Sequence, residues 1–590
     1  MKQRKGFALR KPAKVLMIFL FTAMGNVYAQ APTQPTLPQK TVNLTLPAQG
    51  TSACPTLTTG SNCIRNVPSG NATSFQQAIN ASTCGDTIVL VAGSTYSGNF
   101  AIPSTSCSGW IEIKSSALAS LPASGTRVGP SNVSNMATIS TSNTSPAIQF
   151  NANSNHWRLM GLEITTSDSN SGDTVYYLVA MGESITSLSQ LPSYIIFDRT
   201  YIYGSTTAST EHGIGMDGAS IGIVDSYCDE IVDSGADAQC LLAYNGPGPF
   251  LIQNNFLQAT GENIMFGGAD PSISNLVPSD ITIIGNTIQK NVAAWMGVIS
   301  DVKNLFELKN AQRVLLDGNV IQYTWAAGQS NAILLRGVNQ GGNCTWCVVQ
   351  DVTLTHNLIQ HGPTAISIAN PDTGTVAQTT QRILVQNNVL NDFSEAKWGG
   401  GHGWLFYIAI DNDYAPPLNN IVIDHNTGFV DQIDIYIGDA GTVQNLQITN
   451  DIFQHGSIGG VGAIGTAEGT PSLTSSYVSS YVWNDTVFIT PTGSSSGTYP
   501  SRTLWSTLAG VNFTSISGTS PNYSGNFQLT SGSAYHNAGT DGKDIGVWDW
   551  TCLNNDSAAA LAGTFVPSPG CAMSGDLLPQ PPTNLTVTVQ

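Results

Sequence analysis

Residues 281–288 read ITIIGNTI, and residues 314–321 read VLLDGNVI. Residues 352–359 (VTLTHNLI) and 383–390 (ILVQNNVL) repeat one pattern, in which positions one, three and eight are apolar and position six is Asn. Apolar residues at i and i+2 face the same side of a strand. Asn tolerates left-handed backbone and therefore suits a turn. The four stretches predict short strands that each enter a turn at an asparagine.

Looser copies of the pattern recur over most of the chain. These looser copies centre on Leu162, Arg199, Ser226, Asn426 and Asp451, and Asn255 anchors another clear copy. The anchors of all copies, 25 to 38 residues apart, are Leu162, Arg199, Ser226, Asn255, Asn286, Asn319, Asn357, Asn388, Asn426 and Asp451. A fixed motif with variable spacing indicates rigid strands joined by loops of different length. Coils stacked at the interstrand distance of about 4.8 Å would place one asparagine over the next. We therefore predict an all-β fold, a right-handed parallel β-helix.

Other repeat architectures fit the pattern less well. A leucine-rich repeat is shorter and more regular, and a propeller needs four antiparallel strands per repeat. A solenoid must also cover its ends, because open strand edges pair with other chains. Residues 74–79 (SFQQAI) have the pattern of a short amphipathic helix and are predicted to cap the N-terminal end.

The remaining segments suggest an exported protein. Residues 1–29 combine six basic residues, a short apolar run and a small-residue cleavage site, which together predict a signal peptide. We assign residues 30–70 to a Pro/Thr-rich linker, 71–548 to the β-helix, 549–578 to a second linker and 579–590 to the start of a fibronectin type III-like domain. No later stretch is long and apolar enough to suggest a membrane span in the mature chain. The expected location is secreted, whether extracellular, at the cell surface or in the periplasm.

Charge narrows the choice of partners. Removing the six basic residues of the signal peptide leaves 15 Lys and Arg against 38 Asp and Glu, a net charge of −23. A nucleic-acid-binding protein needs a basic face, so no nucleic-acid partner is expected.

Ten cysteines follow the signal peptide, and an even number in an exported chain predicts disulfides. Pairing of near neighbours gives Cys54–Cys63, Cys84–Cys107, Cys228–Cys240, Cys344–Cys347 and Cys552–Cys571. Cys344 and Cys347 match a redox C-x-x-C motif, but they lie in a Gly-rich loop without a βα context. We interpret them as structural rather than catalytic.

The N-terminal part of the predicted solenoid resembles the pectate-lyase-like β-helix superfamily. The resemblance rests on the short helix at 74–79 followed by residues 85–93 (GDTIVLVAG). Residues 535–546 are similar to the closing turn of related bacterial proteins, so the resemblance covers roughly 74–548. It implies a pectin-lyase fold and an extracellular polysaccharide as partner.

Alignment of the second strand of each coil exposes a candidate site. The aligned segments are 264–267 (IMFG), 306–309 (FELK), 333–336 (ILLR) and 366–369 (ISIA). The first and third residues of each would face the core, and the second and fourth the solvent. Lys309 and Arg336 then share one outward column on adjacent coils, with Glu307 beside Lys309.

These strands are similar to the Lys and Arg strands of chondroitinase B-like and alginate lyases. The resemblance implies Lys309 as the base, Arg336 as the acid and Glu307 as a ligand of Ca²⁺ that helps neutralise the substrate carboxylate. In that family the Arg is typically followed by His-Gly, whereas Arg336 is followed by Gly337. Asp217 falls in the Lys309 column two coils earlier, where a calcium or sugar contact is conceivable. A simpler interpretation is a surface ion pair of Lys309 with Glu307.

Aromatic and acidic residues in loops provide further candidates. Trp325, Trp398 and His402 are candidate sugar contacts, although loop tryptophans are equally common as buried anchors. Asp411 and Asp413 could form the carboxylate pair of a glycoside hydrolase or a solvated turn. We therefore predict a secreted polysaccharide-binding protein, with cleavage of uronic-acid glycans by β-elimination as the leading activity. The alternatives are a non-catalytic adhesion protein and a glycoside hydrolase.

Overall fold

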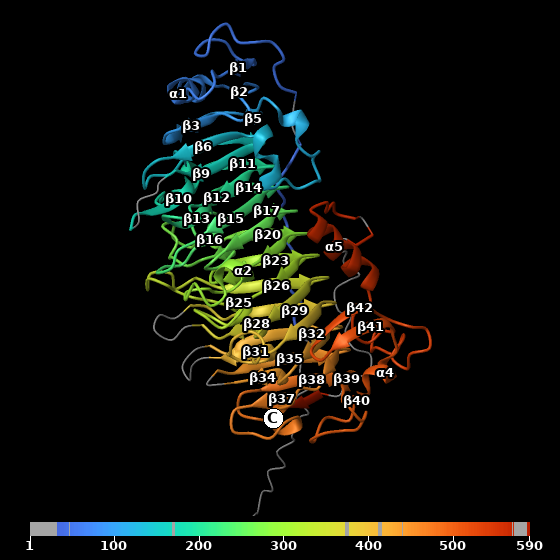
Figure 1. The fold of residues 1–590 in the computed structure, drawn as a ribbon. Coiled ribbons are helices and arrows are strands. Elements are labelled where there is room, and N and C mark those ends of the chain that lie inside the picture. The colour runs from blue at the N-terminus through green and yellow to red at the C-terminus, as the bar shows by residue number, and fades with distance from the viewer. Residues whose placement is uncertain are drawn as a thin grey trace, which may run out of the picture.

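The computed structural model describes residues 32–45, 48–167, 172–371, 377–410, 416–438, 441–568, 570–571 and 587–589. Its body is a right-handed parallel β-helix in which each coil contributes one strand to each of three sheets (Figure 1). This confirms the predicted fold class. The predicted signal peptide and the predicted hydrolase pair Asp411 and Asp413 lie outside the described residues.

Sheet 1 contains, in spatial order, β1 (Ile64–Asn66), β2 (Thr87–Leu90), β5 (Ile111–Ser115), β8 (Asn155–Met160), β11 (Ser193–Asp198), β14 (Ala219–Val224), β17 (Phe250–Gln253), β20 (Ser279–Ile284), β23 (Ala311–Asp317), β26 (Val349–Thr355), β29 (Gln381–Gln386), β32 (Leu418–Asp424), β35 (Val443–Thr449), β38 (Ser480–Asn484) and β43 (Val587–Val589). Its pairs are parallel except that β43 runs antiparallel to β38.

Sheet 2 contains β4 (Phe100–Ile102), β7 (Ile148–Phe150), β10 (Thr174–Met181), β13 (Ser209–Gly215), β16 (Gln239–Ala243), β19 (Ile264–Phe266), β22 (Phe306–Leu308), β25 (Asn331–Arg336), β28 (Thr364–Ala369), β31 (Trp404–Ile410), β34 (Ile433–Ile437) and β37 (Gly459–Ala463).

Sheet 3 contains β3 (Thr95–Ser97), β6 (Ala137–Thr141), β9 (Leu162–Thr166), β12 (Tyr201–Tyr203), β15 (Tyr227–Ile231), β18 (Phe256–Ala259), β21 (Thr287–Gln289), β24 (Val320–Gln322), β27 (Leu358–Gly362), β30 (Val389–Phe393), β33 (Thr427–Val430), β36 (Ile452–Gln454), β39 (Thr486–Ile489) and β40 (Thr503–Ser506). The core between the three sheets is filled by the inward Ile, Leu, Val and Phe side chains of the repeat.

The predicted asparagine ladder runs along the turn between sheets 1 and 3. Asn286 donates its backbone N–H and its side-chain amide to Oδ1 of Asn319, both at 2.9 Å. Asn319 does the same to Asn357, at 3.0 Å for both bonds. The ladder continues through Asn388 and Asn426 to Asp451. These stacked bonds confirm the register inferred from the repeat.

One predicted anchor is displaced by a residue. Thr200, not Arg199, occupies the ladder position, and its backbone N–H donates to Ser226 Oγ at 3.0 Å. Arg199 is the residue just before the turn, and its backbone is left-handed, with φ of 51°. The sequence pattern is ambiguous at this coil, because the strand residues before and after the turn are apolar in either of the two alignments.

Helix α1 (Ala72–Ala81) covers the N-terminal end of the solenoid, as predicted. Its apolar face buries Phe75, Ala78 and Ile79 against the first coil. All five predicted disulfides are present. Disulfides in this number are typical of proteins in an oxidising, extracellular environment. Among the described residues, none of the helices has the length and apolar character that crossing a membrane requires.

The stacked coils end earlier than the predicted boundary at residue 548. After β40 the chain forms a hairpin of β41 (Phe513–Thr519) and β42 (Asn522–Leu529) that packs on the outside of sheet 3. Its Phe513, Phe527 and Leu529 bury themselves against Phe429 of β33. Because those outward positions of sheet 3 are apolar, they require an external cover.

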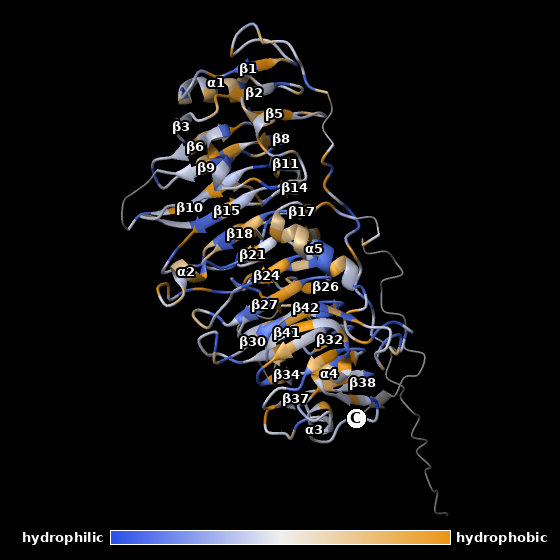
Figure 2. Cartoon of the chain, turned by 45° about the vertical axis from the view of Figure 1, so that its right-hand side comes forward, coloured by the Kyte–Doolittle hydropathy of each residue, from blue (hydrophilic) through white to orange (hydrophobic). Residues whose placement is uncertain are grey.

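The predicted second linker, 549–578, contains the 13-residue helix α5 (Trp550–Ala562). Figure 2 shows α5 lying against the side of the solenoid. The end of α5 covers the turns of the asparagine ladder, because Asn254 Nδ2 donates to Gly563 O and Thr287 Oγ1 to Ala560 O. The short helices α2 (Val292–Trp295), α3 (Thr470–Leu473) and α4 (Leu508–Val511) lie in loops. The 3₁₀ turns are Leu118–Ser120, Pro130–Asn135 and Leu188–Gln190.

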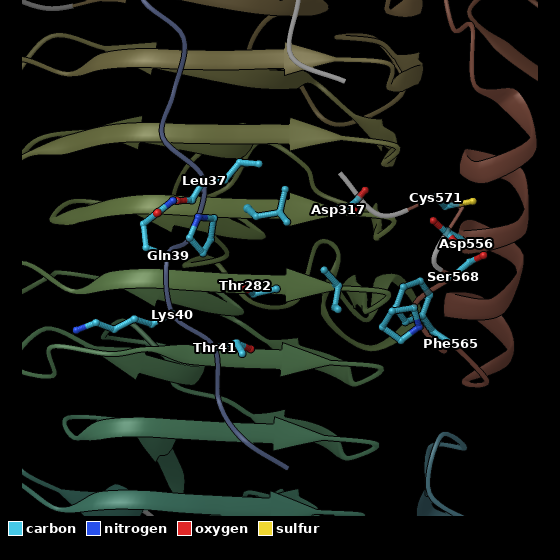
Figure 3. Close-up of a pocket in the computed structure, with 14 residues that line it drawn as sticks. Leu37, Gln39, Lys40, Thr41, Thr282, Asp317, Asp556, Phe565, Ser568 and Cys571 are labelled. Atoms are coloured by element: carbon cyan, nitrogen blue, oxygen red, sulfur yellow. The ribbon is translucent and has the colours of Figure 1, made fainter. Parts of the chain in front are cut away.

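Residues 32–45, which we call the strap, belong to the predicted first linker but lie across the strands of sheet 1 (Figure 3). Three backbone N–H groups, three residues apart, donate to side chains on every second strand: Thr33 to Asn420 (3.0 Å), Thr36 to Asp351 (3.0 Å) and Gln39 to Asp280 (2.8 Å). On the strands between, Arg313 pairs with Asp280 and Arg382 with Asp351.

The strap also packs at its far end. Val42 is buried against Ile196, Val224 and Leu251, and Leu44 packs on the same cluster. These apolar and polar contacts explain why the segment does not behave as a free linker.

A cavity of about 360 Å³ separates the middle of the strap from the segment after α5 (Figure 3). It is lined by residues of the strap, sheet 1 and the C-terminal segment, such as Leu37, Thr282 and Phe565. It lies on sheet 1, whereas the predicted catalytic residues belong to sheet 2.

Candidate functional site

The candidate site lies on the outer face of sheet 2. The four segments aligned from the sequence pair in the predicted register: Ile264 with Phe306, Phe306 with Ile333, and Ile333 with Ile366. The residue that follows each of these core positions also pairs with its counterpart on the neighbouring strand. Because side chains alternate between the two faces of a strand, these residues point outward; they are Met265, Glu307, Leu334 and Ser367.

Lys309 and Arg336 directly follow the paired residues Leu308 and Leu335. They therefore hold equivalent outward positions on neighbouring strands, and both side chains are half-buried. Lys309 Nζ lies 3.4 Å from Glu307 Oε1, and Arg336 Nε donates to Asn370 O at 3.1 Å. The structure thus places Lys309 and Glu307 in contact and puts Arg336 at the equivalent position of the next strand, bonded to the coil beyond it.

Two buried glutamates stand beside Lys309. Glu307 is 1% exposed, and its Oε2 accepts a hydrogen bond from Asn304 Nδ2 at 2.7 Å. Glu262, on the preceding coil, is fully buried, and its Oε2 accepts from Gln239 Nε2 at 2.6 Å. Burial raises the pKa of Glu262, the nearby Glu307 raises it further, and Lys309 opposes this.

Three oxygen atoms in this group are buried and, within the described residues, accept no hydrogen bond. They are Glu262 Oε1, Asn304 Oδ1 and Glu307 Oε1, the last of which faces Lys309 Nζ at 3.4 Å. Buried polar atoms without partners cost free energy. Carboxylate and amide oxygens are the ligands that Ca²⁺ prefers. The donor set therefore fits a calcium ion.

Lys290 holds the backbone that carries these side chains. It is 1% exposed, and its Nζ donates to the carbonyl oxygens of residues 259–261, to Asn263 Oδ1 (2.7 Å) and to Asn304 O (3.1 Å). One ammonium group thus ties the turns preceding β19 and β22 together. Lys290 is therefore a positioning residue beneath Glu262 and Asn304.

Asp217 lies in the Lys309 column, as predicted. It is three coils before Lys309, however, and not two. Three interstrand steps of about 4.8 Å exclude a shared ion, because Ca²⁺ ligands lie about 2.3–2.6 Å from the metal. Asp217 Oδ1 accepts from the backbone N–H groups of Tyr244 and Asn245 at 2.7 and 2.6 Å. It braces a turn, and burial raises its pKa to about 7.

The predicted sugar-contacting tryptophans are buried. Trp325 and Trp398 are 3% and 6% exposed and pack with Trp295 and Val302 in a satellite core under the loops between sheets 3 and 2. Their ring faces are therefore covered by protein, as expected for loop anchors. His402 is exposed and stacks on Trp404 with ring centroids 3.8 Å apart.

The sequence interpretation missed Glu262, Asn304, Gln239 and Lys290. Glu262 and Asn304 each lie two residues before an aligned core position, Ile264 and Phe306. Extending the strand alignment backwards by two residues would have found them. Lys290 had no such signal, because its five acceptors are mostly backbone carbonyls of another coil.

No protein-family description matches the sequence, and no curated protein is similar to it in sequence. Solved structures with a similar fold include the PL6 family alginate lyase AlyGC, at 10% identity over 78% of this chain and 55% of that chain, with a TM-score of 0.43. Another is the alginate lyase from Paenibacillus sp. str. FPU-7, at 13% identity over 59% of this chain and 99% of that chain, with a TM-score of 0.37. The pectate lyase Pel9A is 13% identical over 83% of this chain and 97% of that chain, with a TM-score of 0.33. The likeness is one of fold.

Proposed function

We propose that this chain is a secreted polysaccharide lyase that cleaves a uronic-acid-containing glycan by β-elimination on the outer face of sheet 2. The observation that carries the proposal is the placement of Lys309 and Arg336 in one outward column, next to the buried carboxylates of Glu307 and Glu262. Cations are scarce in this chain, which makes two neighbouring ones on the same face notable.

Elimination needs a base, an acid and compensation for the substrate carboxylate. Nζ of Lys309 takes the proton from the carbon next to the carboxylate. The electron pair left behind forms a carbon–carbon double bond, and the bond to the glycosidic oxygen breaks. The guanidinium of Arg336 donates a proton to that oxygen as it leaves.

A calcium ion at Glu262, Glu307 and Asn304 would supply positive charge that stabilises the carboxylate as negative charge develops on it. Lys290 contributes by holding the two turns that carry Glu262 and Asn304. Glu307 links the proposed base to the proposed calcium site, since it contacts both Lys309 and Asn304.

The test is incubation with alginate, pectate and chondroitin, with and without Ca²⁺. Elimination produces an unsaturated sugar that absorbs ultraviolet light, whereas hydrolysis produces reducing ends without that absorbance. Lys309→Ala should lower the rate by at least about 10²-fold, the usual contribution of a general base. Lys114→Ala, which removes a lysine paired with Glu112 on sheet 1, is the matched control and should keep full activity. Unchanged activity of Lys309→Ala would refute the assignment.

A further inference from the structure

A hollow of about 270 Å³ opens on the same face of sheet 2, on the N-terminal side of Lys309. It lies over β10, β13, β16 and, through Met265, β19, which pairs directly with β22. One interstrand step of about 4.8 Å separates its near edge from the Lys309 strand, so a single extended polymer can contact both places.

The walls of the hollow are aromatic. Tyr176 and Tyr177 pack edge to face at 4.9 Å, and both contact the ring of His212, at 4.8 and 4.6 Å. Tyr244, which packs on the cluster that contains Tyr177, also lines the hollow. Tyr176 is 53% exposed, so one large ring remains open to solvent at the rim. Exposed aromatic rings beside a hollow are suited to stacking on the apolar face of a sugar.

The floor of the hollow carries buried polar atoms. Gln239 is 1% exposed and lies beside His212 on the paired strand β13, with which it interacts weakly; within the described residues neither Gln239 Oε1 nor His212 Nδ1 has a well-formed hydrogen bond. Gln239 Nε2 is already committed to Glu262, which orients the amide. Burial lowers the pKa of His212 to about 4, so the imidazole is neutral at pH 7. A neutral imidazole and an amide oxygen can bond sugar hydroxyl or amide groups.

The charge around the hollow discriminates between sugars. Glu211 and Asp237 line it, and its lining, all within the described chain, includes no Lys or Arg. The nearby Lys303 is already paired with Asp237. Burial, together with the neighbouring Asp233 and Asp237, raises the pKa of Glu211 to about 7, so further negative charge is disfavoured at this place and a uronate would be repelled. An uncharged sugar would meet only hydrogen-bonding groups and ring faces.

We infer that this hollow is a subsite for an uncharged sugar residue of the polymer whose uronate lies at Lys309 and Arg336. The inference rests on the proposed function and deepens it, because it names the substrate as a heteropolysaccharide that combines uronate with uncharged sugars. Polymers built entirely of uronate, such as alginate and polygalacturonate, leave the subsite without a matching residue.

The experiment compares binding of chondroitin, in which uncharged N-acetylated sugars alternate with uronate, with binding of alginate and polygalacturonate at equal ionic strength. The wild-type chain should bind chondroitin at least tenfold more tightly. Tyr176→Ala and His212→Phe should each weaken chondroitin binding by about tenfold and leave polyuronate binding unchanged. Tyr194→Ala is the matched control, since Tyr194 is 45% exposed and stacks on His156 on sheet 1. Circular dichroism spectra and melting temperatures verify that the variants fold.

Lys309→Ala separates this inference from the proposed function. If it abolishes the ultraviolet signal but keeps chondroitin binding that depends on Tyr176, both stand. Chondroitin binding that depends on Tyr176 without any elimination product from any polymer supports the subsite and refutes the lyase. Equal binding of all polymers, or chondroitin binding unaffected by Tyr176→Ala and His212→Phe, overturns the subsite.

Discussion

Replacing Asn319 by Leu should open the solenoid locally at the turn between β23 and β24. Asn319 is fully buried, and its Oδ1 accepts from both the backbone N–H and the side chain of Asn286. Its own amide donates to Ile283 O, Asp317 O and Asn357 Oδ1. Leu provides none of these bonds.

The loss of free energy that stabilises the closed turn can be estimated from those bonds. The buried N–H of Asn286 loses its acceptor, which costs about 1–3 kcal/mol, and the lost side-chain bonds add about 1 kcal/mol each. With four such side-chain bonds, the sum is about 5–7 kcal/mol for opening this part of the ladder. Since about 1.4 kcal/mol is a tenfold change in an equilibrium constant, amide exchange should accelerate roughly 10³-fold or more.

Hydrogen exchange read by mass spectrometry is the suitable assay, because stacked repeats do not unfold as one unit. Peptides that contain Asn286 and Asn319 should lose protection, while those from the first coils keep it. The Asn319→Ser variant should lose less protection, because a serine can still accept the backbone N–H of the preceding coil. Ser226 does so at the equivalent position, where its Oγ accepts the Thr200 N–H. Asn80→Ala, at an exposed position of helix α1, is the control. Unchanged exchange around Asn286 in Asn319→Leu would show that the ladder contributes nothing to stability.

Three further changes test other parts of the structure. Lys290→Met should lower both the melting temperature and any elimination rate, because the carbonyls of residues 259–261 lose their shared donor; a full-rate variant would contradict its positioning role. Burial lowers the pKa of His425, but Asp424 and Asp541 raise it to about 9, above the unfolded value of about 6.5. Its contribution to stability, about 3 kcal/mol at most, is therefore complete below about pH 6.5 and lost as the pH rises through 9. Melting temperatures of His425→Gln should lack that alkaline decrease; an identical decrease in the variant would rule His425 out. Asp351→Ala should lower the melting temperature, because Arg382 loses its partner and the Thr36 N–H its acceptor, and no change would mean that the strap is held elsewhere.

The repeat made the body of the fold predictable. Inward residues such as Ile283 and Leu316 recur at fixed offsets from Asn286 and Asn319, so strand register followed directly from the sequence. The column of Lys309 and Arg336 followed from the same alignment. Disulfide partners were predictable because each pair is separated by 23 residues or fewer.

Features that depend on contacts outside the repeat were not predictable. The burial of Trp325 and Trp398 depends on how three loops from different coils meet, and the loops share no motif. Asp217 was placed one coil too close because loop lengths vary between anchors. The strap was assigned to a linker because its composition is typical of one, whereas its docking depends on Asp280, Asp351 and Asn420, which lie far away in sequence.

The strap also sets a rule for the length of the solenoid. Three residues of extended chain reach about 10 Å at most, and two interstrand steps span about 9.6 Å, so the segment between Thr33 and Gln39 has almost no slack. A coil inserted or lost between β20 and β32 would leave at least one strap N–H facing an arginine instead of an acceptor. Duplication or deletion of coils in this region can preserve the docking only in pairs, each matched by three residues of the strap.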